Sequence, residues 1–175
     1  MLLPLVVVDT RLGPLDFTDA RMVPTEEVPE PFNRLLVHTF HMTVTVEEFY
    51  GEAVNVQVVS SQSEGDLYLR KILLTLSKSK RVIQFGLVRI DLTCLDPAVR
   101  DAILEEKTPL GRVLIEHNVL RRVQPTAFVT VRPKETMKKW FGMSEATPLH
   151  GRTGVIFCND RPAIAVMEIL APVHH

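Results

Sequence analysis

The sequence predicts a single α+β domain in which helices cover one face of an antiparallel β-sheet. Segments with alternating or β-branched patterns outnumber segments with helical spacing, and the links between successive predicted strands are short. A length of 175 residues fits one domain, and a hydrophobic content of 46% is enough for a sizeable core. We therefore expect residues 1–175 to fold as one unit around one sheet.

The first thirty residues predict a strand and then an irregular connection. MLLPLVVV, at residues 1–8, is apolar but short, and it lacks a basic flank, so it is typical of a strand and not of a signal peptide. Residues 9–30 contain a Gly-Pro pair, two further prolines and few apolar runs. This composition predicts a connection that runs over the surface.

The sequence pattern of the segment from Pro31 to Tyr50 changes near Met42, from helical spacing to a β-branched run. Apolar residues up to Met42 recur at helical spacing, which predicts a helix that ends at about Met42. The residues Thr43–Val46 that follow are mostly β-branched and weak in a helix, so the pattern leaves their structure open.

Two segments in the middle of the chain predict a β-hairpin. LYLRKILLTL at residues 67–76 and RVIQFGLVRI at residues 81–90 flank the polar turn SKSK. A further strand is expected from Val54, where VNVQVVS alternates. After the hairpin, Asp96 and Pro97 supply an N-cap and a first-turn proline for a helix.

The stretch KTPLGRVLI predicts a second helix directly afterwards. Thr108 is a good N-cap, and Pro109 suits the first helical position. A helix N-terminus leaves backbone N–H groups unpaired, so it can receive a carboxylate or a phosphate. From this motif alone, an ordinary capped helix without a ligand is the favoured explanation.

The last third of the chain predicts strands around one short helix. A strand is expected over residues 125–131, and a helix over 134–142 that ends at its glycine. Residues 154–158 and 163–170 then predict a hairpin around Asn159-Asp160.

Two charged residues interrupt apolar strands. Arg70 shares its strand face with the apolar side chains of Tyr68, Ile72, Leu74 and Leu76, and Glu168 has apolar neighbours on both faces of its strand. An unpaired buried ion costs several kcal/mol, so each charge needs a partner. Three explanations remain open: a buried Arg70–Glu168 pair, side chains that reach water at strand ends, or a ligand.

Composition excludes several classes of partner. The net charge is −1 with both signs spread along the chain, so we expect neither nucleic acid nor a membrane surface as a partner. Cys94 and Cys158 are the two cysteines, and they favour reduced core thiols and a cytoplasmic location. His38 and His41 lie three residues apart, but no third ligand is evident, so we expect no metal site.

Several of these motifs together resemble the chorismate pyruvate-lyase family, including its bacterial and archaeal branch. The resemblance runs from about Leu35 to Pro172, and it rests on YLRKILL, the following hairpin, KTPLGRVLI, a GR pair and a proline-led last strand with a glutamate. It implies an α+β domain whose sheet and helices enclose a ligand pocket. It also implies a carbon–oxygen lyase that converts chorismate to 4-hydroxybenzoate and pyruvate without a metal or an organic cofactor.

The resemblance also implies a set of site residues. Arg70 matches the arginine that holds the ring carboxylate, and Glu168 matches the glutamate that meets the far end of the ring, so both are expected in catalysis. The expected substrate-binding residues are Met42, Arg70, Arg89, Leu110, Gly111 and Glu168, in which Met42 and Leu110 act through backbone N–H groups.

The sequence departs from the family pattern at two places. Glu168 lies one residue farther from the proline of the last strand than in the family, and such a slip reverses its face unless a bulge absorbs it. Where family members have another arginine, this chain has Gly86 and Leu87, and Arg89 is the nearest replacement.

The sequence therefore supports two hypotheses of function. The first is a chorismate lyase that acts in a buried pocket. The second is a non-catalytic module that binds a small carboxylate, similar to the effector domains of GntR-type regulators. No winged-helix segment is expected in residues 1–30, which disfavours a regulator but not a separate binding module.

Overall fold

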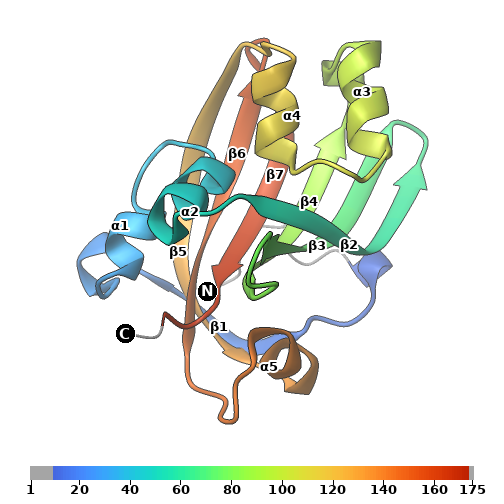
Figure 1. The fold of residues 1–175 in the computed structure, drawn as a ribbon. Coiled ribbons are helices and arrows are strands. Elements are labelled where there is room, and N and C mark those ends of the chain that lie inside the picture. Colours follow the sequence, from blue (N-terminus) through green and yellow to red (C-terminus); the bar gives the residue numbers. More distant parts are fainter. Residues whose placement is uncertain (1–9, 174–175) are drawn as a thin grey trace.

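The computed structural model describes residues 10–173 and confirms the predicted α+β fold (Figure 1). Within these residues, one seven-stranded sheet has the order β1-β5-β6-β7-β4-β3-β2, and every neighbouring pair is antiparallel. The strands are β1 Phe17–Val23, β2 Val54–Glu64, β3 Leu67–Leu76, β4 Val82–Asp91, β5 Arg121–Pro133, β6 Leu149–Cys158 and β7 Arg161–Leu170.

Four helices pack on one face of the sheet, and the fifth packs on the other. The helices are α1 Phe32–Leu36, α2 Met42–Tyr50, α3 Pro97–Leu104, α4 Leu110–Glu116 and α5 Glu135–Phe141, with short 3₁₀ turns at η2 Thr10–Leu12, η3 Thr25–Glu27 and η4 Leu92–Cys94. Helices α2, α3 and α4 overlie the strands in Figure 1, α1 lies to the left of them, and α5 lies near the lower end. No helix in the described part of the chain is long and apolar enough to cross a membrane.

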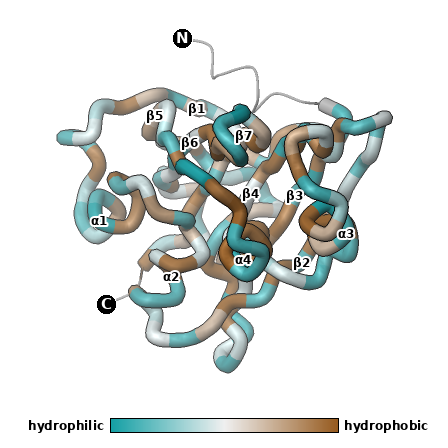
Figure 2. The backbone as a smooth tube through the Cα atoms, turned by 90° about the horizontal axis from the view of Figure 1, so that it is seen from above, coloured by the Kyte–Doolittle hydropathy of each residue, from teal (hydrophilic) through white to brown (hydrophobic). Residues whose placement is uncertain are grey.

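The core follows from the alternation of the strands. Even-numbered residues of β3, such as Tyr68 and Ile72, face helices α1 to α4, and odd-numbered residues such as Leu73 pack with α5 through Met137 and Phe141. The tube of β3 and β4 is largely hydrophobic between the helices (Figure 2). Both faces of the central strands are therefore buried, which explains their near-continuous apolar sequences.

The predicted hairpins are confirmed. Strand β3 covers residues 67–76, and it pairs with β4 across the polar turn. Strands β6 and β7 turn at Asn159 and Asp160, whose φ angles are 52° and 64°. Positive φ at both central residues suits a two-residue hairpin, and Asn and Asp tolerate it better than most residues.

The prediction for residues 9–30 is wrong. This segment contains β1 (Phe17–Val23), which pairs with β5 at the edge of the sheet. The strand has a polar sequence, FTDARMV, with only Phe17 buried, and its register shifts near Asp19. An edge strand of this kind lacks the apolar alternation that identifies a strand in a sequence. The strand predicted for residues 1–8 lies outside the described residues.

The helix predicted to end near Met42 is also wrong. Helix α1 ends at Leu36, and a separate helix, α2, begins at Met42 and includes Thr43–Val46. The β-branched residues are tolerated in α2 because Met42 and Val46 are buried in the core between helix and sheet. The chain bends between the two helices, and we call residues 37–41 the α1–α2 connection.

The predicted helix starts after β4 are largely confirmed. Helix α3 begins at Pro97 with Asp96 as its N-cap residue. Helix α4 begins one residue later than predicted, at Leu110, with Pro109 as N-cap and no side-chain capping bond, so Thr108 is not the cap. Helix α5 ends at Gly142 in the left-handed conformation, as its sequence predicts.

Candidate functional site

A small cavity lies between the sheet and the first turns of α2 and α4. Its volume is about 40 Å³, and its floor is formed by side chains of β3, β4 and β7. It is lined by His41, Met42, Thr43, Val56, Arg70, Ile72, Leu74, Gln84, Gly86, Val88, Leu110, Gly111, Ile156, Val166 and Glu168. Five of the six residues predicted to form the site therefore lie around one enclosed space.

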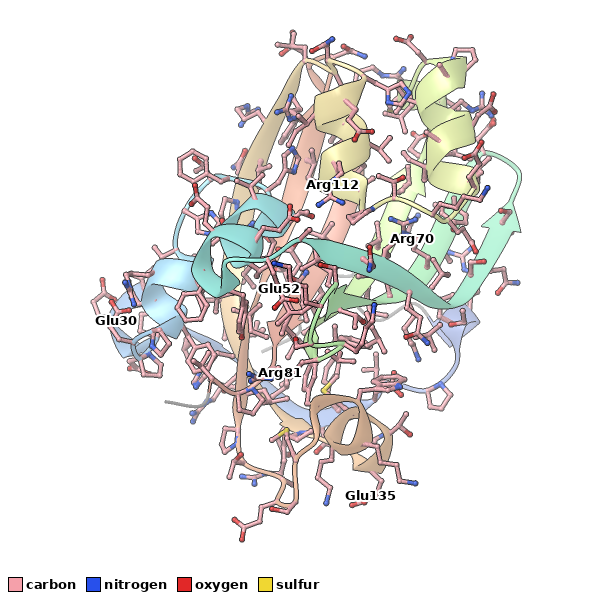
Figure 3. The ribbon with its side chains drawn as sticks, viewed as in Figure 1. Glu30, Glu52, Arg70, Arg81, Arg112 and Glu135 are labelled. Carbon is pink, nitrogen blue, oxygen red and sulfur yellow. The ribbon has the colours of Figure 1, made fainter. Side chains whose placement is uncertain are left out.

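Arg70 is buried in this cavity with much of its hydrogen-bonding capacity unused. Its side chain extends from β3 below the segment that leads into α4 (Figure 3), and the residue is 1% exposed. Its Nε and Nη1 atoms have no hydrogen-bond partner in the described part of the chain. Burial lowers the pKa of Arg70, whereas Tyr68 and Glu106 nearby act in the opposite direction. The cavity therefore contains a guanidinium group with two free donors.

The ion partner of Glu168 is Arg152, and not Arg70. Arg152 Nε donates a hydrogen bond of 2.9 Å to Glu168 Oε2 across the β6–β7 pair. Two explanations offered by the sequence, an Arg70–Glu168 pair and a strand-end arginine that reaches water, are thus both wrong. Because Arg152 already balances the charge of Glu168, Arg70 is left without a carboxylate at salt-bridge distance among residues 10–173.

Arg152 also holds the α1–α2 connection in place. Its Nη1 donates to the backbone oxygens of Leu36 and His38 at 3.2 and 2.8 Å, and its Nη2 donates to that of Phe40 at 2.9 Å. The residue is 2% exposed. One buried side chain of the sheet therefore binds both a cavity carboxylate and the chain segment that leads into α2.

Glu168 faces the cavity because β7 contains a bulge. Phe157 pairs with Pro162, but Ile156 pairs with Ile164, so Ala163 is an extra residue in β7. The extra residue determines which later side chains of β7 face the helices, and Glu168 is among the residues that line the cavity.

The helix starts meet closely above the cavity. A Cβ atom on Gly111 would lie 3.0 Å from His41 Cβ and 3.2 Å from Thr43 Oγ1, so a larger residue would separate α4 from α2. Arg112 Nη2, on α4 (Figure 3), and Glu47 Oε2, on α2, form an ion pair of 2.6 Å that joins the same two helices. Met42, Leu110 and Gly111, which lie at these two helix starts, line the cavity.

Arg89 does not belong to the site, which corrects the prediction. It pairs with Leu69 and Ala165, and it lines a separate hollow on the opposite face of the sheet, together with Glu64 and Asp91. An arginine three residues after Gly86 occupies the other face because strand side chains alternate. Among the described residues, Arg70 is therefore the one arginine that lines the cavity.

The two histidines near the cavity make hydrogen bonds within the protein. His38 Nε2 lies 2.8 Å from Leu35 O, and His41 Nε2 accepts a 2.8 Å hydrogen bond from Arg121 Nε. Burial, and then the charges of Arg121 and Arg152, lower the pKa of His41 to about 4. In residues 10–173, no three His, Cys, Asp or Glu side chains are grouped so that they could hold a metal ion.

Sequence reasoning gave no role in the site to Gln84, which lines the cavity, or to Arg152, which binds the cavity carboxylate Glu168. The predicted strand began at Gly154, two residues after Arg152, although the GR pair belongs to the same strand. Gln84 lies on a correctly predicted strand and shares a face with Gly86 and Val88. The signal available in the sequence was a glutamine among the otherwise apolar residues 82–88.

The comparisons with known proteins identify the fold. No family model matches the sequence, and no curated protein matches it. PhnF from Mycobacterium smegmatis matches with a TM-score of 0.58 and 13% identity over 79% of this chain and 70% of that chain. Its isolated effector domain matches with a TM-score of 0.58 and 13% identity over 78% of this chain and 95% of that one.

A third solved structure agrees with these two. The ligand-binding domain of a GntR-type regulator from Bordetella bronchiseptica matches with a TM-score of 0.50 and 13% identity, over 69% of this chain and 87% of that chain. The chain thus has the fold of the effector domains of GntR-type regulators, a fold related to that of chorismate lyase. At this level of identity, the likeness concerns the fold alone.

Replacing Arg152 by Ala should lower the free energy of unfolding by about 3–5 kcal/mol, because Glu168 and three backbone oxygens would lose their shared donor. Urea denaturation measures the change. The matched control is Arg122→Ala, since Arg122 is exposed and stacks on Phe157; its effect should stay below about 1 kcal/mol. Equal losses in the two variants would contradict the central role of Arg152.

Acidification should destabilise the protein through His41. Its pKa is about 4 in the folded protein, against an ordinary value of 6.5 for histidine, so the unfolded chain binds more protons between these values. This contribution to stability is fully present above about pH 6.5, and it is lost as the pH falls toward 4, by an amount on the order of 2–3 kcal/mol. The free energy of unfolding, measured with urea between pH 7.5 and 4.5, should fall less steeply with decreasing pH in His41→Gln than in wild type. An equally steep fall in the variant would contradict the role of His41 in this pH dependence.

Proposed function

We propose that this chain is a binding domain for a small carboxylate, which Arg70 holds inside the cavity. One observation carries the proposal: a nearly fully buried arginine has two donors, Nε and Nη1, without a partner among the described residues. A buried charge without an ion pair costs several kcal/mol, and a bound carboxylate supplies an opposite charge and an acceptor for one of these donors. Similarity to the ligand-binding domains of regulators supports binding without conversion.

The size of the cavity implies that its walls move when a ligand enters. A volume of about 40 Å³ corresponds to about three water molecules, whereas pockets for larger ligands measure roughly 300–1,000 Å³. On this proposal the ligand is small, and the domain closes around it.

A chorismate lyase is the second candidate function. It is favoured because Arg70, Leu110, Gly111, Met42 and Glu168 lie around one cavity. Two features weigh against it: Gly86 leaves one arginine for a substrate with two carboxylates, and Arg152 neutralises Glu168, the expected acid. These features make simple binding of a monocarboxylate the better explanation.

Binding of carboxylates should depend on Arg70. We expect Arg70→Gln to weaken the binding of benzoate or hexanoate by about 10–100-fold, because a hydrogen bond to a charged group is worth about 1.5–3 kcal/mol. Titration calorimetry measures the affinity. Arg34→Gln is the control, since it removes the same charge from a side chain that is 72% exposed. Arg70→Gln should also keep or raise the melting temperature, so an unfolded variant or unchanged binding would refute the proposal.

Chorismate distinguishes the two candidate functions. On the proposed function, wild-type protein leaves chorismate intact when the mixture is followed by chromatography. Release of 4-hydroxybenzoate and pyruvate in equal amounts, lost in Arg70→Gln and kept in Arg34→Gln, would replace the binding proposal by the lyase.

A further inference from the structure

Strand β5 has an open edge over its first residues. Strand β1 pairs with β5 only at residues 128–133, and the last pair joins Val23 to Phe128. Residues 121–127 of β5 pair with β6 on one side and with no described strand on the other. In Figure 1 the upper half of β5 is accordingly the left border of the sheet. Such an edge presents backbone N–H and C=O groups to which another strand can bind.

The backbone groups of Arg121 and Val123 point toward this open edge. Asn159 N–H donates a 2.7 Å hydrogen bond to Leu120 O, so the backbone of Leu120 points toward the β6–β7 hairpin. Backbone groups of successive strand residues point in opposite directions, so the even-numbered residues that follow also point toward β6. Arg121 and Val123 point away from β6. Pro125 has no N–H, so the open edge is short.

An apolar groove of about 700 Å³ runs beside the open edge. It lies between the start of β5, the end of α4 and the α1–α2 connection. Four exposed apolar side chains line it: Phe40, Val44, Ile115 and Leu120, of which Phe40 is 66% and Leu120 65% exposed. They are half of the eight large apolar residues that are exposed in the described part of the chain. Such a cluster around a hollow is typical of a contact site for another molecule.

The charges that line the groove are positive. Arg121 and Arg122 line it, and neither has a carboxylate at salt-bridge distance among residues 10–173. Arg121 donates to His41, which is neutral at pH 7 because its pKa is about 4. Arg122 donates to Gln124 and lies over the ring of Phe157. Acidic side chains on a partner would therefore complement the groove.

The two arginines lie on opposite faces of the sheet. Val123 packs with Leu114 of α4, so Arg121 shares the face of the helices and Arg122 lies on the other face. A strand added to the edge would alternate in the same way. Its side chains on the helix face would contact the apolar residues of the groove, and those on the other face would lie beside Arg122. The edge therefore favours a segment in which apolar and acidic residues alternate.

A second copy of this chain is disfavoured at this edge. Two copies that paired their β5 edges about a two-fold axis would bring together two copies of Arg121 and of Arg122. No carboxylate lines the groove to balance these four charges. Like charges that face each other across a strand pair are destabilising, so a different protein with its own acidic residues fits better.

We propose that the groove beside residues 121–125 binds an extended segment of a partner protein in which apolar and acidic residues alternate, and that this segment adds a strand to the open edge of β5. The backbone groups of Arg121 and Val123 would contribute affinity, and the alternating side chains would contribute specificity. The inference does not depend on carboxylate binding by Arg70, which lines the other cavity.

A synthetic peptide in which valine and glutamate alternate, blocked at both ends, tests the binding by titration calorimetry. One control peptide has the same composition with its valines and glutamates in separate blocks, and another has lysine in place of glutamate. The alternating peptide should bind wild-type protein at least about tenfold more tightly than either control. Equal binding of a control peptide, or no binding of the alternating peptide, would overturn the inference.

Amide hydrogen exchange, followed by NMR, tests strand addition itself. With saturating peptide, the N–H groups of Arg121 and Val123 should exchange at least about tenfold more slowly, because they gain hydrogen-bond partners. The N–H groups of Arg122 and Gln124 point toward β6 and are the internal control, so their exchange should change by less than about threefold. A peptide that binds without slowing exchange at Arg121 and Val123 would overturn strand addition.

Two matched pairs of variants test the side chains of the groove. Arg122→Glu and Leu120→Ser should each weaken peptide binding by about fivefold or more. Their controls, Lys139→Glu on α5 and Leu104→Ser on α3, make the same changes at exposed residues outside the groove and should leave binding unchanged. Equal effects within either pair would overturn the assignment of the groove. A wild-type dimer in sedimentation that Leu120→Ser dissociates would assign the groove to a second copy and would also overturn it.

Discussion

The hydrogen bonds of Arg152 determine how the helical layer meets the sheet. Its guanidinium group has five N–H donors in a fixed plane, and it serves the carboxylate of Glu168 and three backbone oxygens of residues 36–40. Without Arg152, the oxygens of His38 and Phe40 would lose this donor where the chain leaves α1 and bends toward α2. The bend sets where α2 begins, and the first turn of α2 forms one wall of the cavity. Through Arg152, strand β6 thus positions the first turn of α2, which is distant from it in sequence.

Arg70 and Arg152 are buried to the same extent, but their surroundings differ. Arg152 has hydrogen-bond partners for Nε, Nη1 and Nη2, whereas Nε and Nη1 of Arg70 have none among the described residues. The cost of removing a charge from water is therefore offset by a direct ion pair for Arg152, whereas Arg70 has no such pair among the described residues and is only partly compensated by the nearby charge of Glu106. An anion that binds Arg70 would offset that cost, so ligand binding and folding stability are coupled in this domain. This difference separates a structural arginine from a candidate binding residue.

The sequence predicted the central sheet well because both of its faces are buried. Period-two alternation placed Arg70 and the strands β3 and β4, and the charges of Arg70 and Glu168 on apolar strands indicated where the cavity lies. Alternation defines a face of a strand but not the neighbouring strand, so it could not pair Glu168 with Arg152. The edge strand β1 was missed because it buries little, and the α1–α2 boundary was missed because a distant arginine determines it. The wrong predictions concern features that tertiary contacts determine. Local sequence patterns were largely sufficient to predict the other strands and helices.

The position of the cavity and its chemistry have different origins. Its position follows from the topology, since β3, β4 and β7 are neighbours in the sheet and α2 and α4 begin above them. Domains that share this fold can therefore share a cavity in the same place with little sequence identity. Its chemistry depends on a few side chains, above all Arg70, Gln84 and Gly86. A single free guanidinium, a neutralised carboxylate and an unpartnered amide in the described part of the chain together favour a ligand with one negative charge, and they disfavour a substrate that needs two cationic partners.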